Sequence, residues 1–370
     1  MRAAVFLAVA ASLLAAPPAR SHPGHDPDPV RVSHPEPAAV PPAAVAAGVV
    51  AALAAVGLAC RRKGFALPVG VVAASLTALA AAGDKDIPPA RRHFEAFRDK
   101  LDLRVEGDTL FVGSDGFPDH PMMVGITAWQ QQVPLPQPYA GKNAWQIPLK
   151  PRLADKPVSA RTGLFRGAIA LAVNGVPIFN ALNNRGEDAY LAGELDEYGG
   201  HCGRGDDYHY HAAPVHLQKA AGKGNPIAYA LDGYPLYGYA DADGKEPDDL
   251  DEFNGRVETG GYRYYSTRKY PYINGGLRGV VTVRGDGVEP QPRDAPVRPP
   301  GRPLRGAKVT GFTRDDEKRV YAVEYELRGK PLSVRYTIRN DGAYAFVFTD
   351  GAGKETAETY RRRDRKDRRE

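Results

Sequence analysis

The sequence predicts a mainly β fold, with an internally duplicated domain followed by a small C-terminal antiparallel β domain. Short apolar runs are separated by Asn-Gly and Asp-Gly pairs, which are typical of hairpin turns. Blocks of similar sequence recur in the same order within residues 172–265. Near the C-terminus, residues 319–327, 331–339 and 343–349 read as strands separated by turns. A β-rich α+β fold is the alternative.

The N-terminal residues 1–20 read as a secretory signal peptide. A basic start at Arg2 leads into an apolar run that ends in small residues before Pro17. That run has about 14 residues, whereas a membrane crossing needs about 20. Residues 21–41 are rich in proline and contain three histidines, and they indicate a linker, with a metal-catching tract as the alternative.

Residues 42–83 contain two apolar stretches, each long enough for a transmembrane helix. The basic cluster Arg61–Lys63 separates them, and the positive-inside rule places this cluster in the cytoplasm. The chain after residue 84 would then be extracytoplasmic, in the periplasm or at the cell surface. The alternative is an Ala-rich helical pair packed in a soluble core.

The exported part divides into a main domain over residues 95–287 and a small β domain over residues 305–360. A proline-rich linker, residues 288–304, separates them. The tail, residues 361–370, has seven basic and three acidic residues, so it carries +4 of the formal +5. The folded domains are therefore nearly neutral. We expect contacts of the tail with an anionic envelope, and no binding of nucleic acid.

The main domain contains an internal repeat, residues 172–211 and 230–265. Its matching blocks are Ala172–Phe179 with Ala230–Tyr237, Leu195–His201 with Leu250–Arg256, and Tyr208–His211 with Tyr262–Tyr265. The second copy has Arg256, Arg263 and Tyr265 where the first has His201, His209 and His211. A purely structural role would not require one copy to keep all three histidines, so the difference favours a ligand role. The acidic pairs 196–197 and 251–252 occur in both copies and indicate scaffold residues.

The motif Tyr208-His209-Tyr210-His211 predicts a metal site. Side chains alternate between the faces of a strand, so His209 and His211 share one face, roughly 7 Å apart. His201, which follows two glycines in the preceding loop, would complete a ligand set for zinc or copper. The alternative is that these histidines hydrogen-bond within a β core.

Secondary candidate ligands are Asp206, His120 and Cys202. Asp206 and Asp207 lie close to the motif and suit a ligand or a carboxylate that orients an imidazole, with solvated turn residues as the alternative. A buried free thiol is the favoured interpretation of Cys202, because adjacent His201 and Cys202 would point to opposite faces of an extended segment.

These residues resemble the YHYH-domain family of secreted bacterial proteins. The resemblance is carried by Gly199–His201, Tyr208–His211, the turn Asn174–Pro177 and Ala230–Gly233, and the segment Gly116–His120 is similar to the family's opening segment. It covers roughly residues 100–285 and implies an exported domain with a shared histidine site, but no particular reaction. The second copy departs from the pattern, because it lacks every histidine.

We therefore expect one transition-metal ion to bind through these histidines, and the leading hypothesis is metal binding or sensing at the cell envelope without catalysis. The first alternative is a metal-dependent hydrolase or oxidase with an open coordination position, whose base would be Asp206, Asp207 or Glu194. The second is a structural or adhesive envelope module without metal. The sequence has no nucleophile elbow, phosphate loop or zinc-protease helix motif.

Overall fold

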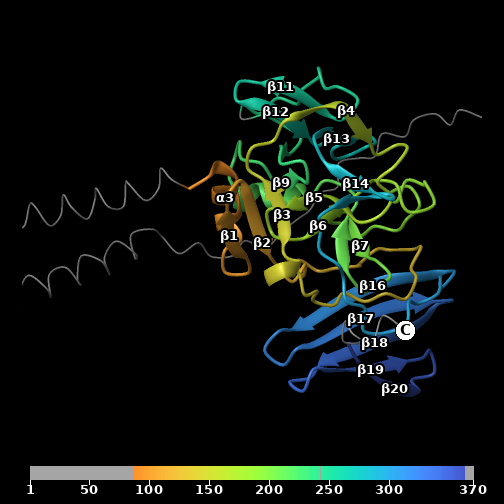
Figure 1. Ribbon diagram of the computed structural model, residues 1–370. Helices are drawn as coiled ribbons and strands as arrows, with labels where there is room; N and C mark the ends of the chain where they lie inside the picture. The colour runs from red at the N-terminus through yellow and green to blue at the C-terminus, as the bar shows by residue number, and fades with distance from the viewer. Residues whose placement is uncertain (1–86, 242, 363–370) are drawn as a thin grey trace, which may run out of the picture. The chain divides into compact units, whose positions relative to one another are not determined.

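The computed structural model describes residues 87–241 and 243–362, which belong to one compact unit (Figure 1). The predicted signal peptide, the linker and the two predicted transmembrane helices lie outside the described residues, as do residues 363–370 of the basic tail. Among the described residues, no helix has the length and apolar character that a membrane crossing requires.

The prediction of a mainly β fold is confirmed, since the described residues form five sheets and only short helices. The helices are α3 (Pro89–Phe94) and α4 (Gln218–Ala221), with 3-10 turns η1 (Glu95–Phe97), η2 (Gly141–Asn143) and η3 (Val215–Leu217). Three smaller sheets surround the central one: β1 (Asp102–Glu106), β2 (Thr109–Gly113) and β3 (Trp145–Pro148); β4 (Leu153–Ser159) with β13 (Gly276–Gly279); and β14 (Thr282–Arg284) with β15 (Gly287–Glu289).

The central sheet has eight strands in the order β11-β12-β10-β9-β5-β6-β8-β7. Counted inward from the two edges, the strands correspond in pairs: β11 with β7, β12 with β8, β10 with β6 and β9 with β5. Its first half comprises β5 (Ala168–Ala172), β6 (Pro177–Phe179), β7 (Gly200–Cys202) and β8 (Tyr208–Tyr210). Its second half comprises β9 (Ala228–Ala230), β10 (Pro235–Tyr237), β11 (Gly255–Glu258) and β12 (Gly261–Tyr265). The innermost strands β5 and β9 are buried throughout, as their continuous apolar sequences require.

The two halves use the same turns. β5 and β6 are joined through Asn174-Gly175, and β9 and β10 through Asp232-Gly233, with both glycines at positive φ. At Gly233 a Cβ atom would lie 2.4 Å from the Pro148 carbonyl oxygen, so glycine is also needed for close approach. Tyr210 accepts a hydrogen bond from the Asn174 amide in one half, and Tyr264 donates one to Asp232 in the other.

The C-terminal sheet is antiparallel, and its strands follow one another in sequence (Figure 1). It comprises β16 (Ala307–Asp315), β17 (Val320–Leu327), β18 (Lys330–Ile338), β19 (Ala343–Thr349) and β20 (Glu355–Arg361). The three predicted strands correspond to β17, β18 and β19, whereas β16 and β20 were not predicted. The aromatic side chains of Tyr336 and Phe346 stack on this sheet, and the Tyr336 hydroxyl donates to the Pro134 carbonyl.

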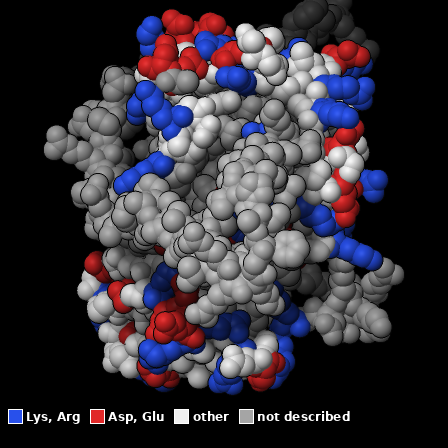
Figure 2. Space-filling model, turned by 90° about the vertical axis from the view of Figure 1, so that its left-hand side faces the viewer, with Lys and Arg blue, Asp and Glu red and all other residues white. Residues whose placement is uncertain are grey.

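The proline-rich segment 288–304 contributes a buried ion pair to the main domain. Arg298 contacts Asp206 at 2.8 Å, and both side chains are more than nine-tenths buried. Elsewhere the ion pairs are mostly exposed. On the face that Figure 2 shows, positive and negative side chains lie side by side at both ends of the described part.

Candidate metal centre

A short hairpin at the edge of the central sheet brings the three histidines together. His201 on β7 lies directly opposite His209 on β8, and His211 follows the end of β8. The Nε2 atom of His211 lies 3.0 Å from Nε2 of His201 and 3.1 Å from Nε2 of His209. The prediction that His209 and His211 share one face is confirmed, and His201 belongs to a strand rather than to a loop.

The other ring nitrogen of two of these histidines is already engaged. Nδ1 of His209 lies 2.9 Å from the Asp207 carbonyl oxygen, and Nδ1 of His211 lies 2.5 Å from that of Asn180. A carbonyl oxygen only accepts, so both Nδ1 atoms carry the proton and donate it. When both rings are in this neutral form, their Nε2 atoms present lone pairs, and these atoms lie 3.1 Å apart.

A cation between the Nε2 atoms of His209 and His211 would relieve the repulsion of two facing lone pairs. Burial, together with the neighbouring imidazole of His209, lowers the pKa of His211 to about 3. Burial also lowers the pKa of His201 well below its usual value. These two rings are therefore neutral at pH 7, and a metal ion is the cation that suits neutral nitrogen donors.

The spacing of the nitrogens matches a metal ion. Zinc–nitrogen bonds of about 2.0–2.1 Å in a tetrahedron place two ligand nitrogens roughly 3.3 Å apart. The observed separations of 3.0 and 3.1 Å are close to this value. Among the described residues, these three histidines form the one group whose ligand atoms lie within 4.8 Å of one another.

Neighbouring groups hold the rings in place. The ring of Phe179 stacks on His209 with centroids 3.8 Å apart and an interplanar angle of 14°. The side-chain amide of Asn180 donates to the carbonyls of Ala160 and Gly163, which fixes the backbone that orients His211. Such contacts behind the ligands set the tautomer and direction of each imidazole.

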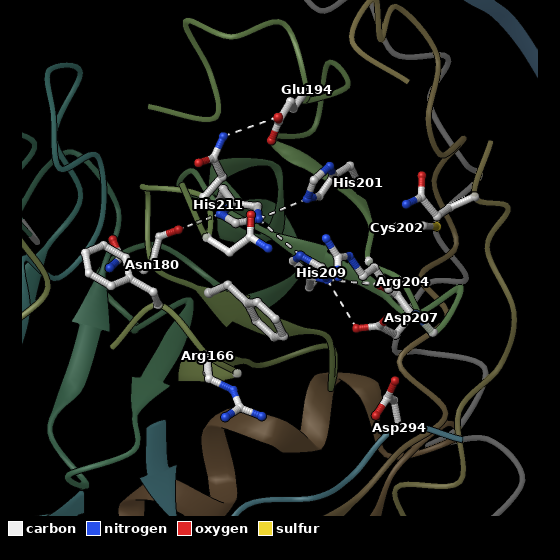
Figure 3. A pocket seen from close by; sticks show the side chains of 18 of the residues that line it. Arg166, Asn180, Glu194, His201, Cys202, Arg204, Asp207, His209, His211 and Asp294 are labelled. Carbon is white, nitrogen blue, oxygen red and sulfur yellow. Dashed lines mark hydrogen bonds and ion pairs between the residues drawn. The ribbon is translucent and has the colours of Figure 1, made fainter. Parts of the chain in front are cut away.

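The histidines form part of the wall of a cavity of about 400 Å³. Figure 3 shows their rings converging, with Glu194 beyond them and Arg166, Arg204 and Asp294 around the rest of the cavity. A metal held by three protein ligands keeps an open coordination position, unlike a closed four-ligand structural site. The cavity gives such a position room for a small molecule.

The three carboxylates predicted near the site differ in whether they line the cavity. Asp206 accepts from the guanidinium of Arg298 and from the Val133 amide, so it fixes the chain rather than facing the histidines. Asp207 lines the cavity, and its carboxylate lies 3.5 Å from Nδ1 of His209. Glu194 also lines the cavity and is buried, where it accepts from Asn183 and Arg185.

The other two candidates lie on the tyrosine side of β8. His120 stacks on Tyr198 with centroids 3.9 Å apart, and its Nε2 lies 2.9 Å from the Tyr210 hydroxyl. Cys202 is buried opposite Tyr208, and burial raises the pKa of its thiol well above the usual value. Among the described residues, neither side chain belongs to the group of close ligand atoms formed by the three histidines.

The second half of the sheet contains the corresponding hairpin, but its side chains are charged arginines instead of histidines. Arg256 lies opposite Arg263 there, as His201 lies opposite His209. The side chains of Arg256, Arg263 and Tyr265 converge on the Glu258 carboxylate at 2.8, 2.9 and 2.5 Å. In the second half, three hydrogen-bond donors thus surround an anionic carboxylate. At the corresponding place in the first half, the ring nitrogens of the histidines face one another.

Glu258 of the second half corresponds to Gly203 of the first half, because each lies two residues after the paired residue Arg256 or His201. Gly203 lies eight residues before His211. A Cβ atom at Gly203 would lie 2.7 Å from an Asp207 carboxylate oxygen and 3.0 Å from a ring carbon of His209. In the first half this position has no side chain, and the carboxylate of Asp207 lies against it instead. This pair was not predicted from the sequence, because the repeated blocks end before it.

The fold and the site define a class: a mainly β domain with a three-histidine cluster on an edge hairpin, beside a cavity. Residues 144–248 match the family model described as YHYH protein, and this part of the chain belongs to that family. The matched range includes all three histidines. No curated protein and no solved structure matches the chain.

Proposed function

We propose that this domain binds one transition-metal ion, zinc or copper, through Nε2 of His201, His209 and His211. The observation that carries the proposal is the pair of Nε2 lone pairs that face each other at 3.1 Å while both Nδ1 atoms donate to carbonyls. Without a cation this arrangement is repulsive, and it is buried, so water screens it poorly.

The second half of the sheet supports this proposal as an internal comparison. There the corresponding side chains contact the carboxylate of Glu258, and Arg256 also pairs with Asp241 and Asp249. In the first half, glycine stands at the position of Glu258, and no acidic side chain of the described residues lies between the Nε2 atoms of the histidines, which supports a partner from outside the chain. We infer that the two halves derive from a duplication in which one copy kept the metal ligands.

The proposal also includes the cellular location of the protein. The signal peptide expected in residues 1–20 and the apolar pair expected in residues 42–83 support a membrane-anchored protein whose main domain is extracytoplasmic. In that compartment the site would take up metal directly from the cell envelope. The basic tail supports contact with anionic envelope components.

A second candidate function is a metal-dependent hydrolase or oxidase. It is favoured by the open side of the three-histidine cluster and by the buried carboxylate of Glu194 in the same cavity. A bound metal would act there as a Lewis acid or redox centre. The Glu194 carboxylate would accept a proton, and Arg185 holds it in place.

The proposal is tested by measuring metal content on the purified full-length chain by mass spectrometry. The variant is His209→Asn/His211→Asn, because an Asn amide sits near the Nδ1 position and keeps the hydrogen bonds to Asp207 and Asn180 while removing both Nε2 ligands. The matched control is His93→Asn, since His93 also uses Nδ1, here toward the Tyr229 hydroxyl at 2.6 Å.

We expect about one metal ion per chain in the wild type and in His93→Asn, and none in the double variant. Circular dichroism must show that the double variant is folded. A wild-type chain without metal after incubation with zinc or with copper would contradict the proposal. Equal metal content in all three proteins would place the metal elsewhere in the chain.

A further inference from the structure

The side chain of Gln132 belongs to the wall of the cavity beside the histidines. Gln132 is 4% exposed and lines the cavity, yet its side-chain amide makes no hydrogen bond to another described residue. Its amide atoms are accessible from the cavity rather than sealed inside the protein. An amide can donate and accept hydrogen bonds, so it suits a polar ligand or ordered solvent in the cavity.

Two guanidinium groups lie around the same cavity. Arg166 and Arg204 are exposed at its lining, and neither ion-pairs with another described residue (Figure 3). The third arginine, Arg185, differs because Glu187 and Glu194 neutralise it. Guanidinium groups bind carboxylates and phosphates in a fork geometry, and a partly enclosed site strengthens these contacts.

The lining also contains acidic groups, and they are accounted for locally. The Asp207 carboxylate accepts from the Gly205 amide at 3.0 Å and lies near His209. Asp294 approaches Gly205 so closely that a Cβ there would lie 2.1 Å from its carboxylate. Both acids therefore gather at one loop, whereas Arg166 comes from a different segment, just before β5.

We propose that this cavity binds a small organic oxyanion, with the amide of Gln132 and the guanidinium groups of Arg166 and Arg204 as its contacts. This inference rests on the proposed metal site in one respect: imidazole ligands bring no negative charge to a bound metal ion, which favours an anion at its open position. The volume of about 400 Å³ falls in the range of small-molecule sites.

The experiment uses the full-length chain loaded with Co²⁺, whose visible absorption reports the ligands of the metal. Succinate and methylphosphonate are titrated as the carboxylate and phosphonate probes, and 1,4-diaminobutane is the cationic control. The variants are Gln132→Leu, Arg166→Gln and Arg204→Gln. Arg284→Gln is the matched control, because Arg284 is 76% exposed and lies away from the cavity on β14.

We expect one of the anionic probes to change the Co²⁺ spectrum and the diamine to leave it unchanged. Each cavity variant should bind Co²⁺ as the wild type does but weaken the anion about ten-fold, the loss typical of one hydrogen bond to a charged group. Gln132→Leu should leave the melting temperature close to that of the wild type, because this side chain lines the cavity and makes no hydrogen bond to another described residue. The Arg284→Gln protein should match the wild type.

The outcomes separate the two proposals. If Co²⁺ binds but neither anion changes the spectrum, the cavity proposal is wrong and the metal site stands. Equal anion affinity in the wild type and all cavity variants would show ligation by the metal alone, and would also refute it. If Co²⁺ does not bind, the metal proposal fails, and anion binding is measured by calorimetry on the metal-free chain. Anion binding there that the cavity variants weaken would support the cavity by itself.

Discussion

Acidification should destabilise the metal-free protein through His211. Its ring is 4% exposed, and burial lowers its pKa to about 3 in the folded state. In the unfolded chain the pKa of histidine is about 6.5, so the unfolded state binds more protons between these two values. Stability from this residue is therefore present above about pH 6.5 and is lost as the pH falls toward 3.

The loss of stability follows from the difference between the pKa values of His211 in the folded and unfolded states. Between pH 7.5 and 5.0 the unfolded state gains about 2 kcal/mol from protonating one histidine, and the folded state gains almost nothing. His201 and His120 have lowered pKa values too and act in the same direction. Asp196 opposes them, because burial raises its pKa to about 7 and the folded state takes up its proton first. The contribution of His211 is therefore best isolated by the difference in free energy of unfolding between a His211 variant and the wild type. The pH dependence of the wild type alone contains the contributions of all these groups.

The assay is urea unfolding with a chelator present, at pH 7.5 and at pH 5.0. Both tryptophans of the chain, Trp129 and Trp145, are 2% exposed, so their fluorescence reports the unfolding of this part of the protein. His211→Asn should lose about 2 kcal/mol less than the wild type between the two pH values. If both proteins lose the same free energy, His211 is not held as a neutral buried ring and the reasoning fails.

Three further predictions concern the metal and the two halves of the sheet. Excess metal at about 100 times its dissociation constant should raise the free energy of unfolding by about 2.7 kcal/mol, and a chelator should reverse this in a thermal melt. The triple substitution Arg256→His, Arg263→His and Tyr265→His should raise the metal content to two ions per chain by mass spectrometry; one ion in a folded variant would contradict the equivalence of the hairpins. Asp206→Ala strands the buried charge of Arg298 and should cost about 3–5 kcal/mol in urea unfolding, while adding Arg298→Met should restore part of it. No recovery in the double variant would argue against that ion pair.

The sequence was informative where a short pattern decides the structure. Alternation along Tyr208–His211 predicted the face that His209 and His211 share, and apolar runs predicted β17, β18 and β19. The strand β20 was missed because its residues are almost all polar and exposed, so it has no apolar alternation. In such a strand, pairing to β19 decides the conformation.

The contacts that complete the site could not be predicted, because distant segments supply them. Asn180 lies 31 positions before His211, and nothing in its local sequence marks its carbonyl as the acceptor of a ligand ring. Gln132 reaches the cavity from a stretch without regular structure. His201 was expected in a loop, but a tight turn with Asp206 at φ 57° returns the chain early enough to pair β7 with β8.

The place of the two hairpins in the sheet has a consequence for how this protein can be altered. β7 and β11 are the outermost strands, whereas β5 and β9 at the centre hold the fully buried aliphatic residues. Substitutions at one rim therefore change local chemistry without disturbing the packing on which cooperative unfolding depends. For protein engineering, this makes the sheet a scaffold with two separate grafting positions, one with three converging imidazoles and one in which arginine side chains meet a carboxylate.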